Sequence, residues 1–96
     1  MKVYWHRELP PLDAVPLGAH TIEADSSRVV GMLASREVWD RCSNDLAAHI
    51  ETRLTQEAAR LGGRCAHVLD EHIDVKHDAV RDEAWLHGRY TYMLYR

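Results

Sequence analysis

The amino-acid sequence predicts an α+β fold, in which one long helix packs on a mainly antiparallel sheet of four or five strands. A pattern with helical spacing runs through residues 39–61. Two glycines follow it directly, and two strand-like runs occupy most of the remaining chain up to residue 95. The predicted order is therefore two strands, a helix and two strands, with a short edge strand as a possible addition at the N-terminus.

The length and composition of the chain indicate one small globular domain, residues 1–96. A chain of 96 residues is large enough for a single hydrophobic core, and its hydrophobic fraction of 46% is ordinary for a globular protein. No apolar run approaches the ~18–20 residues that cross a bilayer, and the first residues lack the apolar segment of a secretory signal. We therefore expect a cytoplasmic protein that has no membrane partner.

Charge and cysteine content argue against two further classes of protein. The net charge is −3, and the basic residues are scattered among acids, whereas nucleic-acid binding needs clustered positive charge. Cys42 and Cys65 are the only cysteines and lie far apart, without the CxxC-like spacing of redox or metal motifs. We expect no nucleic-acid partner and a pair of reduced, partly buried thiols.

The N-terminal segment predicts a short strand followed by a connector. Residues 1–6 alternate weakly, with Val3 and Trp5 on one side, which favours an edge strand. The next segment, residues 9–18, contains three prolines. Proline fixes the backbone in extended or turn conformations and removes a hydrogen-bond donor, so this segment should connect strands and not form a helix.

Residues 21–24 and 28–33 have the composition of strands. They flank an Asp-Ser-Ser sequence at residues 25–27, which is typical of a turn, so two strand pieces are expected here. One long bent strand is the alternative. Gly31 within the second piece suggests a bulge or a close approach of another backbone.

The helix is predicted from apolar residues that recur three or four positions apart. They are Trp39, Cys42, Leu46, Ile50, Leu54, Ala58 and Leu61. This spacing places them on one face of a helix, which we interpret as the face that packs on the core. Ser35, Asp40 or Ser43 could cap the first turn. Gly62 and Gly63 should end the helix, because glycine accepts the left-handed conformation of a C-cap.

The two C-terminal runs, residues 64–75 and 83–95, predict a β-hairpin joined by a polar link at residues 76–82. A turn centred between Ala79 and Val80 would sort the side chains into a polar and an apolar face. The polar pairs would be Lys76–Glu83, Asp70–Arg89, Asp74–Trp85 and His72–His87, and the apolar pairs Val75–Ala84, Ile73–Leu86, Leu69–Tyr90 and Cys65–Leu94.

Two residues do not fit this register. Glu71 and His67 would both lie on the apolar face of the hairpin. A bulge near Asp70 or Glu71 would move them, and so would a position at the margin of the sheet.

The polar face of the hairpin gathers a candidate ligand site. Asp70, His72, Asp74 and His87 would share this face, with neighbours ~7 Å apart along a strand and ~5 Å apart across strands. Imidazole with carboxylate suits zinc or another divalent metal. The same side chains could instead respond to pH, because carboxylates favour protonation of nearby imidazoles. A solvated face with ordinary hydrogen bonds is the third interpretation.

The polar face also carries apolar side chains that predict self-association. Trp85, Val68 and Met93 would lie there, although the single helix can cover only the opposite face. A small chain often covers such a surface with a second copy of itself. We therefore expect a homo-oligomer, with these three residues at the contact.

Catalysis has little support in the sequence. The candidate nucleophiles Ser26, Ser27, Cys42 and Cys65 have no base at a diagnostic spacing. The alternative function is therefore a small enzyme with a pocket between subunits. His72, His87, Asp70 or Asp74 would then act as its acid–base groups.

Residues 58–70, AARLGGRCAHVLD, resemble the helix-to-strand junction of the YbjQ-like family, small bacterial proteins named for heavy-metal binding. The resemblance implies a compact α+β domain that assembles into rings. Together with the patterns above, it leads us to expect a non-enzymatic cytoplasmic module that self-associates. Such a module would bind a small ligand, a metal ion or a protein partner through its sheet face.

Overall fold

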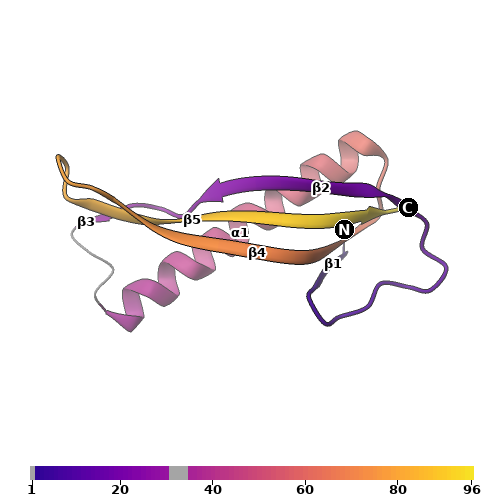
Figure 1. Cartoon of the computed structure of the whole chain (residues 1–96), viewed down its shortest axis with the longest axis horizontal. Coiled ribbons are helices and arrows are strands. Elements are labelled where there is room, and N and C mark those ends of the chain that lie inside the picture. Colours follow the sequence, from indigo (N-terminus) through magenta and orange to yellow (C-terminus); the bar gives the residue numbers. More distant parts are fainter. Residues whose placement is uncertain (1, 31–34) are drawn as a thin grey trace.

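The computed structural model describes residues 2–30 and 35–96, and it confirms the α+β class (Figure 1). The elements in chain order are β1 (Lys2–Trp5), β2 (Pro16–Asp25), β3 (Val29–Val30), α1 (Arg36–Leu61), β4 (Cys65–Asp78) and β5 (Glu83–Tyr95). Gly31, where a bulge was expected, lies outside the described residues. None of the described helical residues forms a segment long and apolar enough to cross a membrane.

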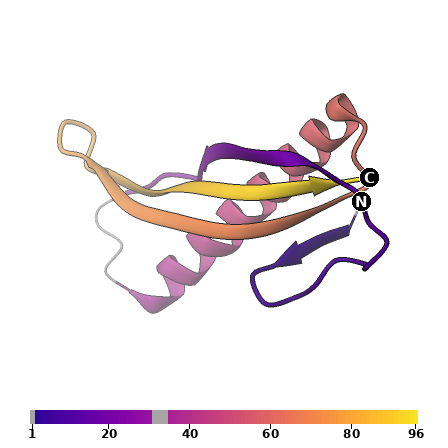
Figure 2. The ribbon, with the colours of Figure 1, turned by 45° about the vertical axis from the view of Figure 1, so that its right-hand side comes forward.

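Among the described residues the sheet has five strands, and β5 lies between β4 and β2. Its order is β1-β4-β5-β2, and the short β3 also pairs with β5. The pairs β4–β5, β2–β5 and β3–β5 are antiparallel, whereas β1 runs parallel to β4 at one edge (Figure 2). The sheet is therefore mixed, and the predicted N-terminal edge strand is present. β2 and β3 are two separate strands that both pair with β5, with residues 26–28 between them, as the prediction of two strand pieces expected.

The helix begins and ends close to the residues that the sequence indicated. Ser35 is the N-cap, and its Oγ accepts a hydrogen bond from the backbone N–H of Val38 at 3.1 Å. Gly62 adopts the left-handed conformation with φ of 78°, and the N–H of Gly63 donates to the carbonyl of Ala58 at 2.7 Å. The chain then turns back into β4.

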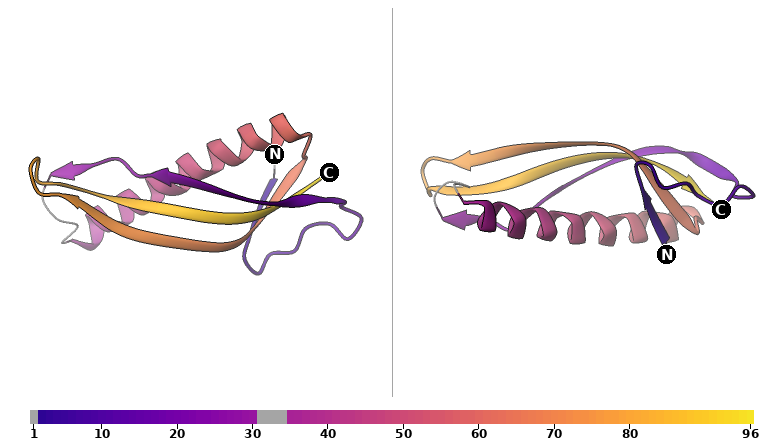
Figure 3. Two further views of the ribbon diagram at one scale, coloured as in Figure 1. Left: turned by 45° about the horizontal axis from the view of Figure 1, so that its top comes forward. Right: turned by 90° about the horizontal axis from the view of Figure 1, so that it is seen from below.

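The core lies between α1 and one face of the sheet (Figure 3). The helix contributes five buried residues: Cys42, Leu46, Ile50, Leu54 and Ala58. It packs mainly on β2 and β5 and reaches little of β4. In β5 every second residue is buried against it: Ala84, Leu86, Gly88, Tyr90, Tyr92 and Leu94. Val3 and Trp5 pack at the margin of this core, on one side of β1 as predicted.

Gly88 permits the close approach of α1 to β5. A Cβ atom added at Gly88 would lie 2.6 Å from the Tyr90 ring and 3.0 Å from Cδ2 of Leu46. Both distances are shorter than van der Waals contact between carbon atoms. The glycine therefore leaves room for the Tyr90 ring of its own strand and for the Leu46 side chain of the helix.

The register of the β4–β5 hairpin corrects the sequence prediction. In residues 70–78, Lys76 pairs with Trp85 instead of Glu83, a shift of two residues. The cause is the turn, which occupies residues 79–82 and has Asp82 at a positive φ of 50°, so its centre is not between Ala79 and Val80. Because side chains alternate with period two, a shift of two residues leaves each one on its predicted face.

A β-bulge divides β4 between Val68 and Asp70, next to the position that the sequence suggested. On the N-terminal side of the bulge, in residues 65–68, the register differs from the prediction by one residue. The side chains there therefore lie on the sheet faces opposite to those predicted. His67 therefore does not lie on the sheet face that packs on α1. Glu71 does lie on that face, at its exposed margin, 3.3 Å from the imidazole of His6. Val68 turns into the core and is 0% exposed, so its prediction as an oligomer-contact residue is wrong.

Candidate binding site on the uncovered sheet face

The sheet face turned away from α1 carries the candidate site, and we call it the open face. Its side chains follow from the strand registers and the alternation within each strand. They are Thr21, Glu23 and Asp25 of β2, Trp85, His87, Arg89, Thr91 and Met93 of β5, and Asp70, His72, Asp74 and Lys76 of β4. The charged members gather in the half nearer the hairpin turn.

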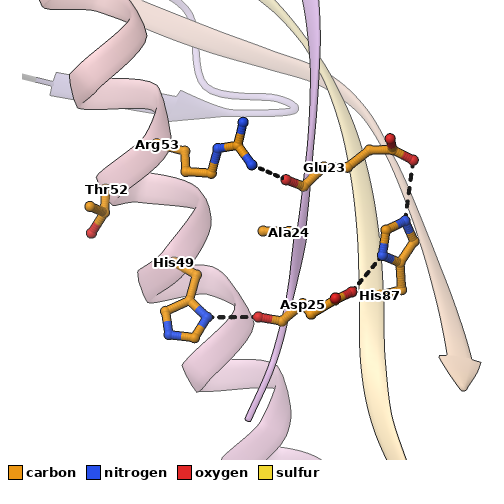
Figure 4. A pocket seen from close by; sticks show the side chains of 7 residues that line it. All are labelled: Glu23, Ala24, Asp25, His49, Thr52, Arg53 and His87. Atoms are coloured by element: carbon orange, nitrogen blue, oxygen red, sulfur yellow. Dashed lines mark hydrogen bonds and ion pairs between the residues drawn. The ribbon is translucent and has the colours of Figure 1, made fainter. Parts of the chain in front are cut away.

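His87 is the centre of the charged half. Its Nδ1 lies 2.5 Å from a carboxylate oxygen of Asp25, and its Nε2 lies 3.2 Å from a carboxylate oxygen of Glu23 (Figure 4). These hydrogen bonds raise the pKa of His87 above its usual 6.5, and the bond to Asp25 contributes more than the bond to Glu23. Burial of the imidazole acts in the opposite direction and lowers the pKa. When it is protonated, the imidazole donates to both carboxylates and joins β2 to β5.

Three of the four predicted site residues come together. His72, Asp74 and His87 line one pocket of about 250 Å³, together with Glu23, Lys76 and Arg89. The Nε2 of His72 lies 3.2 Å from a carboxylate oxygen of Asp74. Asp70 is on the same face, opposite Thr91, but does not line this pocket.

The geometry gives the predicted zinc site no support. Across the strands, His72 pairs with Arg89, and His87 pairs with Asp74, so the two imidazoles are not opposite each other. Within the part of the chain that the structure describes, no group of three or more His, Cys, Asp or Glu side chains is arranged to hold a metal ion.

Sequence reasoning missed the two carboxylates that bind His87. Glu23 and Asp25 belong to β2, which is more than sixty residues away from His87 along the chain. Alternation within β2 could have placed both on one face. The register of β2 against β5 was also needed, however, and no local pattern specifies it.

A second pocket lies between α1 and the outer edge of β2. It has a volume of about 450 Å³ and is lined by Glu23, Ala24, Asp25, His49, Thr52, Arg53 and His87 (Figure 4). Arg53 donates to the carbonyl of Glu23, and Nδ1 of His49 lies 2.7 Å from the carbonyl of Asp25. These helix side chains satisfy carbonyls that point away from the sheet, so this part of the β2 edge is protected from pairing with another strand.

The candidate nucleophiles Ser26 and Cys42 form hydrogen bonds with backbone groups. The Oγ of Ser26 accepts a hydrogen bond from Leu86 N–H at 2.9 Å and so fastens β2 to β5. Cys42 is buried, and its thiol lies 3.8 Å from the carbonyl of Ser27. Within residues 2–30 and 35–96, no hydrogen bond joins Ser26, Ser27, Cys42 or Cys65 to a histidine.

Comparisons of the chain with protein-family models, with curated proteins and with solved structures found no match.

Proposed function

We propose that this chain is a non-enzymatic cytoplasmic module that self-associates and uses its sheet as the binding surface. The open face offers the pocket around His72, Asp74 and Lys76 to a small polar ligand. The assembly itself is formed by copies of the same chain. Both cysteines are free and buried, which agrees with a reducing compartment.

The surface area of the chain carries this proposal. An 11.0 kDa monomeric protein exposes about 5,600 Å² on average. This chain exposes 6285 Å². The excess of about 700 Å² is close to the ~800 Å² that one partner contributes to a standard protein–protein interface. A chain that leaves this much surface exposed has room for a contact of ordinary size.

The shape of the chain supports the same conclusion. Its extents are 49 × 24 × 17 Å, and the shortest leaves space for only two layers, one helix and one sheet (Figure 3). The radius of gyration is 15.1 Å, whereas a compact domain of this length has one of about 12.5 Å. An elongated two-layer chain leaves one sheet face and parts of the strand edges without cover.

The surroundings of His87 favour binding over catalysis. A catalytic imidazole holds one nitrogen on a carboxylate and offers the other to the substrate. In this chain, carboxylates contact both ring nitrogens of His87. A polar residue arranged in this way stabilises the sheet and has no nitrogen free for proton transfer.

Sedimentation velocity of the wild-type chain at micromolar concentrations tests the proposal. We expect a mass that is a multiple of 11.0 kDa and that rises with concentration through a reversible transition. Interfaces of standard size commonly give Kd values in or below this range. A mass of 11.0 kDa at every concentration would contradict self-association.

A further inference from the structure

The outer edge of β4 is unpaired over most of its length. β1 pairs only with Cys65, Ala66, His67 and Val68, and among the described residues no strand lies beside residues 70–78 on that side (Figure 1). This segment also exposes apolar side chains, since Ile73 is 38% and Val75 51% exposed, and Leu69 in the bulge just before it is 47% exposed. An open edge with exposed apolar residues is a surface on which another strand can pair.

The hydrogen bonds between β2 and β5 determine which backbone groups of β4 point outward. Ser26 N–H donates to the carbonyl of Leu86 at 2.8 Å, so the backbone groups of Leu86 point toward β2. Those of its neighbour His87 then point toward β4, where they meet Asp74. By the same alternation, the N–H and C=O groups of Glu71, Ile73 and Val75 point outward from the free edge.

The sequence of this edge is complementary to itself. When two copies run antiparallel about a two-fold axis at Ile73, Asp70 faces Lys76 and His72 faces Asp74, and each pair occurs twice. The two Ile73 side chains then face each other on the sheet face that carries α1. Two other axes would instead bring like charges together. An axis at His72 would place Asp70 opposite Asp74, and an axis at Asp74 would place Asp70 opposite Asp78.

We propose that the β4 edge pairs with the β4 edge of a second copy about a two-fold axis at Ile73. The inference rests on the proposed self-association and names its contact. The pairing would satisfy the outward backbone groups of both copies and bury Ile73. It would also form one continuous open face, on which the pockets lined by His72, Asp74 and Lys76 of the two copies lie next to each other.

Axes at His77 and at Val75 also bring opposite charges together, and both use Asp78. An axis at His77 would place Lys76 opposite Asp78. An axis at Val75 would place Asp74 opposite Lys76 and His72 opposite Asp78. Asp78, however, accepts backbone hydrogen bonds within the turn, at 3.0 Å and 3.3 Å, and lies 3.9 Å from Arg28. Among the ion pairs of the described residues, none uses Asp70 or Lys76, so both are free for the axis at Ile73.

A charge exchange tests this contact. Asp70→Lys or Lys76→Asp alone creates two like-charge pairs across the axis and should weaken self-association at least about tenfold. The double variant Asp70→Lys/Lys76→Asp restores opposite charges and should recover wild-type affinity. Sedimentation velocity measures all three, and circular dichroism checks that each folds. Asp13→Lys, an equal charge change in the exposed connector, is the matched control and should leave the affinity unchanged.

The outcomes separate this contact from the proposed function. A wild-type chain that stays monomeric overturns both. If the wild-type chain assembles and none of the three edge variants changes its affinity, the edge contact alone is overturned. Loss of assembly on Met93→Glu, without an effect of Asp70→Lys, would place the contact on the open face and likewise overturn the edge contact. Recovery in the double variant supports the axis at Ile73, because an axis at Val75 would leave Asp70 without a charged partner.

Discussion

Replacing Leu46 by alanine should lower the free energy of unfolding by about 3 kcal/mol. Leu46 is 1% exposed and lies in the middle of α1, against β5 near Gly88. The substitution removes three buried carbon atoms from a tight helix–sheet contact. The surrounding backbone cannot collapse fully into the space, so the loss includes a cavity contribution.

Chemical denaturation at one fixed protein concentration measures the effect of Leu46→Ala, because self-association makes apparent stability depend on concentration. Gln56→Ala, on the exposed side of the same helix, is the control and should change stability by less than about 0.5 kcal/mol. Equal losses in the two variants would contradict the packing of α1 on β5.

Replacing His87 by glutamine should lower the free energy of unfolding by about 1–2 kcal/mol in mildly acidic solution. The folded state holds the imidazolium between Asp25 and Glu23, so the pKa of His87 is raised above its unfolded value of 6.5. Its stabilising contribution is therefore complete below pH 6.5, and it is lost as the pH rises through the folded pKa. The difference between wild type and His87→Gln should shrink in the same window.

Denaturation curves between mildly acidic and alkaline pH measure this difference for His87→Gln. The control is His20→Gln, because the His20 ring contacts the Tyr92 ring at 5.7 Å between centroids and forms no ion pair with a carboxylate of the described residues. In Asp25→Asn, NMR titration should show a lower pKa for the His87 imidazole than in the wild type. A stability difference for His87→Gln that is the same at every pH would contradict the ionic contact.

The secondary structure of this chain was largely predictable because its signals are local. The spacing from Cys42 to Ala58, the cap at Ser35 and the left-handed Gly62 all act within a few residues. The hairpin was also predictable as an element. Its register was not, because it depends on the positive φ of Asp82 and on the bulge before Asp70, neither of which has a distinctive sequence signal.

The candidate site shows the same division between local and long-range information. His72, Asp74 and His87 share a face as predicted, because a two-residue shift in register preserves the alternation. Val68 could not be placed, because it lies beyond the bulge. Glu23 and Asp25 were missed, because only the long-range pairing of β2 with β5 brings them to His87.

Amide hydrogen exchange at increasing protein concentration tests most directly whether the β4 edge contacts a second copy. The amides of Glu71, Ile73 and Val75 should exchange quickly at low concentration and become protected as the assembly forms. The amide of Asp74, which faces β5, should be protected throughout and serves as an internal reference. Rapid exchange of the three outward amides at every concentration would contradict the account.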